Sequence, residues 1–74
     1  MAYIENGEYG KSIGEFNALI KLNPNYYLPY EGLGKAYFEL GDYEKAESNL
    51  RKSLKLNPSS GESKKLLLRI ETSQ

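Results

Sequence analysis

The sequence repeats itself at an offset of 34 residues, and this repeat constrains the possible folds more than any other feature. The segment 21–24, Lys-Leu-Asn-Pro, returns unchanged as 55–58. Within residues 1–24, the other residues that return unchanged give the pairs Ala2/Ala36, Tyr3/Tyr37, Glu5/Glu39, Gly7/Gly41, Tyr9/Tyr43 and Lys11/Lys45. A fixed period of this length is typical of stacked supersecondary units. We therefore expect an array of similar units, each packing on its neighbours.

The apolar residues within each unit have helical spacing. In the second unit a first stripe, at i, i+3, i+4 and i+7, consists of Leu33, Ala36, Tyr37 and Leu40. A second stripe follows at Tyr43, Ala46, Leu50 and Leu54. Alternating apolar and polar residues, which would indicate strands, are absent from the sequence. Each unit is therefore predicted to be a pair of helices.

Turn signals separate the predicted helices of the second unit. Gly41 has the permissive backbone that ends a helix, and Asp42 is a favourable N-cap for the next one. Pro58 ends that helix because the residue before a proline is disfavoured in the α region. In the first unit we expect the same turn at 6–7, Asn-Gly, and a helix over 9–22 that ends before Pro24.

Two further signals complete the helix prediction. Pro29 falls in a first helical turn, where its missing N–H costs little. Ser59 and Glu62 have the spacing of a capping box, which predicts a last helix ending near Thr72. The sequence therefore predicts a short stub over 1–6, then four helices and no strand.

A 34-residue helix–turn–helix unit resembles the tetratricopeptide repeat. That family's pattern is matched by Tyr30-x2-Leu33-Gly34-x2-Tyr37, then Ala46-x3-Leu50, then Pro58. Gly34 and Ala46 are small, as the pattern requires where the two helices cross closely. The resemblance implies an all-α fold, a right-handed α-solenoid of antiparallel helix pairs. It divides one domain, 1–74, into a truncated first repeat over 1–26, a complete repeat over 27–60 and a C-terminal capping helix over 61–74.

Composition narrows the possible functions. The chain has no cysteine and no histidine, so it lacks the usual zinc ligands, a cysteine nucleophile and a histidine base. Ten Lys and Arg balance ten Asp and Glu, which argues against nucleic acid or an anionic membrane as the main partner. We expect no enzyme, no cofactor and no metal site. Since no apolar leader opens the chain, we expect a cytoplasmic protein.

The resemblance implies a protein–protein interaction module that holds a peptide segment of a partner in a concave groove. We expect the chain to be a fragment of a larger scaffold or adaptor protein, with a partner of unknown identity. Carried over onto this sequence, the candidate peptide-binding residues are Leu28, Glu31, Lys35, Phe38, Glu39, Glu62, Lys65 and Arg69.

An alternative function is structural self-association, in which open repeat ends stack or exchange helices between chains and form a homodimer or larger species. The helix over 9–22 has apolar residues suited to packing on a preceding helix. The last helix carries Leu68 where the family pattern has a small glycine. The candidate self-association residues, expected to be exposed, are Ile13, Phe16, Leu66 and Leu68.

Overall fold

The computed structural model describes residues 2–73, and the side chains of 8–72. These residues form four α-helices: α1 (Ala2–Leu22), α2 (Tyr27–Leu40), α3 (Tyr43–Leu56) and α4 (Gly61–Ser73). The described part of the chain contains no strand. The all-α, helical-repeat fold predicted from the 34-residue period is therefore confirmed.

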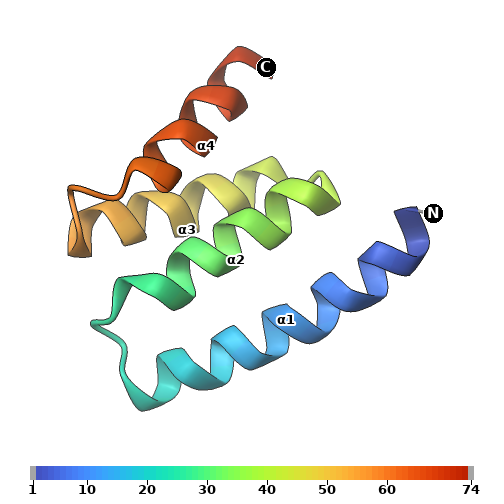
Figure 1. The fold of residues 1–74 in the computed structure, drawn as a ribbon, viewed down its shortest axis with the longest axis horizontal. Helices are drawn as coiled ribbons and strands as arrows, with labels where there is room; N and C mark the ends of the chain where they lie inside the picture. Colours follow the sequence, from blue (N-terminus) through green and yellow to red (C-terminus); the bar gives the residue numbers. More distant parts are fainter. Residues whose placement is uncertain (1, 74) are drawn as a thin grey trace.

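The helices form a flat molecule of 33 × 31 × 16 Å, with α2 and α3 packed together at its centre (Figure 1). On one edge α1 packs on α2 and, within the described residues, makes no contact with α3 or α4. On the opposite edge α4 packs mainly on α3 and also touches α2. The two central helices therefore hold the molecule together, while α1 is attached along one side only.

The turn between α2 and α3 has the predicted geometry. Gly41 has φ 86° in the left-handed region, and its N–H donates to the Phe38 carbonyl. The Asp42 N–H donates to the Tyr37 carbonyl, which completes a Schellman motif. The Asp42 side chain then accepts a hydrogen bond from the Lys45 N–H at 3.3 Å. Gly41 and Asp42 therefore act as the predicted stop and N-cap.

The predicted turn at 6–7 is wrong, since α1 runs without interruption from Ala2 to Leu22. The second unit has Asp42 after its glycine, whereas the first has Glu8 there, and glutamate is a poorer N-cap than aspartate. The predicted stub over 1–6 is wrong for the same reason, because residues 2–6 belong to α1. The C-terminal end of α1, immediately before Asn23 and Pro24, is as predicted.

The cap of α4 lies one residue later than predicted. Helix α4 begins at Gly61, so Ser60, and not Ser59, occupies the N-cap position. The Ser60 hydroxyl accepts a hydrogen bond from the Ser63 N–H at 3.4 Å and donates one to Glu31 at 2.9 Å. Ser60 therefore satisfies an N-terminal donor of α4 and also links this helix to α2.

The core lies where α2 crosses α3. A Cβ added to Gly34 would overlap the side chain of Leu50 and lie 3.3 Å from the Ala46 carbonyl oxygen. Both Leu50 and Ala46 are fully buried. This close approach confirms the prediction that Gly34 and Ala46 are small because the helices cross there. Leu66 and Ile70 extend the same core onto α4.

Two buried serines join α3 and α4. The Ser63 hydroxyl donates a hydrogen bond to the Ser53 hydroxyl at 3.0 Å, and both residues are fully buried. Since a buried hydroxyl is costly without a partner, this pair favours one register of α4 on α3. No helix in the described part of the chain is both long and apolar enough to cross a membrane.

Candidate functional site

Four side chains on one side of α1 face α2. Tyr9, Ser12, Phe16 and Leu19 follow one another at spacings of three or four residues, so they share one side of the helix. The first three are half-buried, and Leu19 is 48% exposed. This row forms one wall of a surface hollow that runs between α1 and α2.

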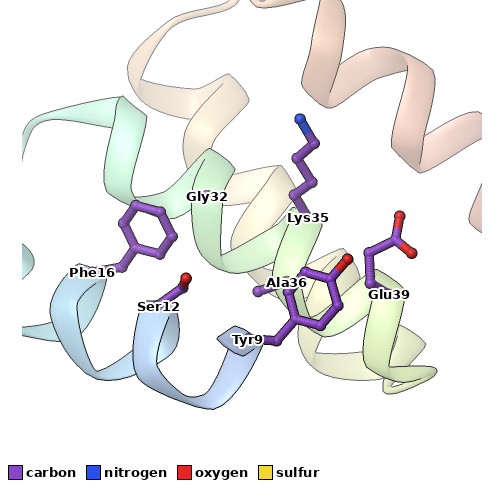
Figure 2. A pocket seen from close by; sticks show the side chains of 7 residues that line it. All are labelled: Tyr9, Ser12, Phe16, Gly32, Lys35, Ala36 and Glu39. Carbon is purple, nitrogen blue, oxygen red and sulfur yellow. The ribbon is translucent and has the colours of Figure 1, made fainter. Parts of the chain in front are cut away.

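Phe16 crosses the floor of this hollow and packs on Gly32. A Cβ added to Gly32 would overlap the far end of the Phe16 ring, so the ring rests directly on the α2 backbone. Figure 2 shows the Phe16 ring turned toward Gly32, with Ser12 beside it on α1. The ring therefore reaches from α1 to α2 and leaves space on either side of itself.

Two cavities adjoin each other at Phe16, and we refer to them together as the α1–α2 groove. The smaller has a volume of about 230 Å³ and the larger about 440 Å³. The smaller is lined by Tyr9, Ser12, Phe16, Gly32, Lys35, Ala36 and Glu39. The larger is lined by Phe16, Leu19, Tyr26, Leu28, Pro29, Glu31, Gly32 and Lys35. The walls of the α1–α2 groove are mainly apolar and aromatic, and its charged groups lie along the rim formed by α2.

Large exposed apolar side chains gather at one end of the groove. Three of them, Leu19, Tyr26 and Leu28, line the larger cavity, and Leu22 ends α1 beside the same turn. Leu68, a large apolar residue on α4, lies away from this end of the groove, and its exposed fraction is 62%. A cluster of exposed apolar residues beside a cavity is typical of an interaction surface.

The charged rim of the groove comes from α2. Lys35 lines both cavities, and Glu31 and Glu39 lie one turn before and after it. Figure 2 shows Lys35 and Glu39 projecting from α2 above the hollow. Glu31 is half-buried and accepts the hydrogen bond from Ser60, so its position is fixed by α4. The groove therefore offers one cation flanked by two carboxylates.

The structure brings half of the predicted peptide-binding residues to the groove, namely Leu28, Glu31, Lys35 and Glu39. Phe38 lies elsewhere, half-buried against Tyr43, with the Arg69 guanidinium 5.8 Å above its ring. Glu62 and Lys65 are exposed on α4 and line neither cavity.

The candidate self-association residues differ in exposure. Leu68 is exposed as expected. The expected exposure of Leu66 is wrong, because Leu66 is only 4% exposed and packs in the core with Leu50 and Ile70. Ile13 and Phe16 are half-buried, and Phe16 rests on Gly32.

Sequence reasoning missed much of the groove wall. Tyr9, Ser12, Leu19, Tyr26 and Gly32 line the cavities and were not predicted as site residues. The α1 row has helical spacing, so a shared face was detectable. The contact between Phe16 and Gly32 joins residues on two helices, so no local signal indicated it.

The acidic residues at the start of α3 have structural partners. Asp42 caps the helix, and Glu47 accepts two hydrogen bonds from the Arg51 side chain. This bonding raises the pKa of Arg51 above its ordinary value, chiefly through the hydrogen bond to Glu47 and then through the carboxylate charge. The pair lies on the exposed face of α3.

Two family models match the chain. A tetratricopeptide repeat model matches residues 29–60, which contain most of α2 and all of α3, and a TPR repeat model matches residues 1–41. No individual curated protein matches the chain. Because the second match alone covers more than half of the 74 residues, the chain belongs to the tetratricopeptide repeat family, whose repeats are non-catalytic protein–protein interaction modules.

Proposed function

We propose that the chain binds a segment of a partner protein in the α1–α2 groove. The observation that carries this proposal is the pair of adjoining cavities that share Phe16, Gly32 and Lys35. Concave, mainly apolar surfaces with a few placed charges are typical of binding sites. In this proposal Leu28, Glu31, Lys35 and Glu39 contact the bound segment directly.

The groove favours a segment with apolar anchors and charges of both signs. Apolar side chains would occupy the cavities beside Phe16, Leu19 and Leu28. A carboxylate of the segment would face Lys35, and a cation would face Glu31 or Glu39. A longer segment would continue beyond the groove toward the remaining predicted contacts, which are Phe38 on α2 and Glu62, Lys65 and Arg69 on α4.

The proposal is tested by selecting binders from a random-peptide library and titrating them against variants of the chain. Lys35→Glu reverses the charge that borders both cavities, so we expect the affinity of acidic selected peptides to fall about tenfold or more. Leu28→Glu adds a charge at the apolar wall and has the same expected effect. Fluorescence anisotropy with labelled peptides measures both.

Lys55→Glu is the matched control, since Lys55 is also an exposed lysine but lies on α3 and lines neither cavity. Its affinity for the selected peptides is expected to stay within about twofold of the original chain. Selected peptides that bind the Lys35→Glu and Leu28→Glu variants as tightly as the original chain would contradict the groove as the binding site.

A further inference from the structure

Helices α1 and α4, at the two edges of the molecule, each correspond to one half of a helix pair like the one that α2 and α3 form. Helix α4 begins at Gly61, 34 residues after α2 begins at Tyr27, so α4 repeats α2. Residues 9–22 of α1 lie 34 positions before α3, so this part of α1 repeats α3. The complete pair in this molecule is α2 on α3. An α4 from one copy and an α1 from another copy could therefore form the same kind of pair.

The repeat register places an exposed leucine opposite the groove. Leu68 stands at the position of Gly34, which in the α2–α3 pair lies against Leu50 and Ala46. The residues of α1 equivalent to these two are Phe16 and Ser12, and both line the groove. In a pair formed between copies, Leu68 of one copy would therefore lie over Phe16 and Ser12 of the other.

The groove has room for this side chain, although the α2–α3 crossing does not. At Gly34 even one added carbon would overlap Leu50, so α2 and α3 have no space for a leucine. Over Ser12 and Phe16 there is an open cavity of about 230 Å³ that shares Phe16, Gly32 and Lys35 with the larger one, so a docked helix can stand farther from α1 than α2 stands from α3. Leu68 has no such cover in its own chain, since it is 62% exposed.

The charges on the two edges are complementary in the same register. In the α2–α3 pair the Lys45 ammonium lies 5.5 Å from the centre of the Tyr37 ring. The equivalent residues on the edges are Lys11 of α1 and Glu71 of α4, both exposed. An oppositely charged pair would thus replace the contact between Lys45 and Tyr37. Lys52 lies over Tyr30 in the α2–α3 pair. The equivalent residues on the two edges are Ala18 of α1 and Lys64 of α4, which do not repel each other.

We propose that the partner segment of the α1–α2 groove is α4 of a second copy of this chain, docked through Leu68. This inference rests on the proposed function, because it names the occupant of that groove. The face of α4 that docks consists of the exposed residues Lys64, Leu68 and Glu71 together with the half-buried Leu67, and the four are spaced at i, i+3, i+4 and i+7. Helices α1 and α4 lie at opposite edges of the molecule (Figure 1). The contact would therefore be heterologous, and each added copy would leave one groove and one docking face open.

Sedimentation equilibrium tests the proposal over a range of about 1 to 200 µM of the full chain. We expect the average mass of the original chain to rise with concentration and to pass that of a dimer. Leu68→Glu, at an exposed position, is expected to remain folded and to stay monomeric. An original chain that is monomeric throughout, or a Leu68→Glu variant that associates equally well, would overturn the proposal.

A mixing experiment distinguishes a heterologous contact from a symmetric one. Leu68→Glu lacks the docking leucine but keeps the groove, whereas Ser12→Glu places a charge in the groove but keeps Leu68. Each variant alone is expected to be monomeric, and their mixture is expected to give a one-to-one dimer and nothing larger. A mixture of the two folded variants that stays monomeric would overturn the proposal.

A charge exchange keeps the test valid if Ser12→Glu fails to fold. Both residues are exposed, and Lys11→Glu and Glu71→Lys should each weaken association because each places two like charges opposite one another. The double variant should associate like the original chain, because it again places one positive charge opposite one negative charge. No recovery in the double variant would contradict the assigned register. Peptide binding by the monomeric Leu68→Glu variant separately tests the groove, so a failure of self-docking and a failure of the proposed function are distinguishable.

Discussion

Gly34 is the residue at which the two central helices approach most closely, and its substitution tests the packing of the core. In Gly34→Ala the new methyl group would overlap Leu50, which is fully buried, and press on the Ala46 carbonyl. Neither group has free space into which it can move, so α2 must shift. Overpacking of this kind costs about 1–3 kcal/mol, which outweighs the gain of about 1 kcal/mol from alanine's helix propensity. We expect a lower urea midpoint with an unchanged slope.

Two other glycines provide controls for this substitution. Nothing lies within 4 Å of a Cβ added at Gly14, so Gly14→Ala should show the propensity gain alone, about 1 kcal/mol. At Gly32 the new methyl would meet only the end of the Phe16 ring, which borders open cavities and can rotate away. We expect Gly32→Ala to be at least as stable as the original chain. A Gly34→Ala variant as stable as these two would contradict the close crossing.

At the scale of helices, the buried hydroxyl pair between Ser53 and Ser63 sets how α4 lies on α3. Ser53→Ala or Ser63→Ala alone removes one partner and leaves the other hydroxyl buried, a loss of about 1–3 kcal/mol. Removing both leaves no unpaired group, so the double variant should be no less stable than the worse single variant. Urea unfolding of the four proteins measures the coupling. Strictly additive losses would show that the two hydroxyls act independently.

The helix ends show which local signals could be predicted from the sequence. The stop at Gly41 and the ends before Pro24 and Pro58 depend on backbone properties of those residues alone, and each was predicted correctly. The Asn-Gly pair at 6–7 resembles the 40–41 turn, but no aspartate follows it and the helix continues. Where the N-terminal cap is weak, a glycine alone does not end a helix.

The groove was harder to predict because it depends on contacts between helices. The family resemblance indicated Leu28, Glu31, Lys35 and Glu39, and the structure brings all four to the groove lining. The contact of Phe16 with Gly32 was missed, although the equivalent residues Leu50 and Leu66 share one core cluster, because it joins two helices and has no local signal. Leu66 was expected to be exposed for the same reason, although its spacing of four residues from Ile70 is consistent with a shared buried stripe.

At the scale of the whole molecule, α1 has no buried side chain among its described residues, so its amides should exchange with solvent before those of α3. Within the described residues it contacts only α2, whereas α3 packs on both α2 and α4 and carries the fully buried Ala46, Leu50 and Ser53. Regions with few buried contacts open locally at a lower free energy than the core. In dilute solution we expect α1 amides to exchange well before those of α3, as measured by hydrogen–deuterium exchange.

Concentration should change this order if α4 of a second copy covers the groove. Docking adds contacts to Ser12 and Phe16 on α1, so opening of α1 would first require dissociation of the docked helix. We expect α1 protection to rise at high concentration in the original chain and to remain unchanged in Leu68→Glu. The α3 amides, whose core is complete within one copy, serve as the internal reference in both proteins. Equal α1 protection in the two proteins at high concentration would show that the groove stays open, because only docking through Leu68 links the exchange of α1 to concentration.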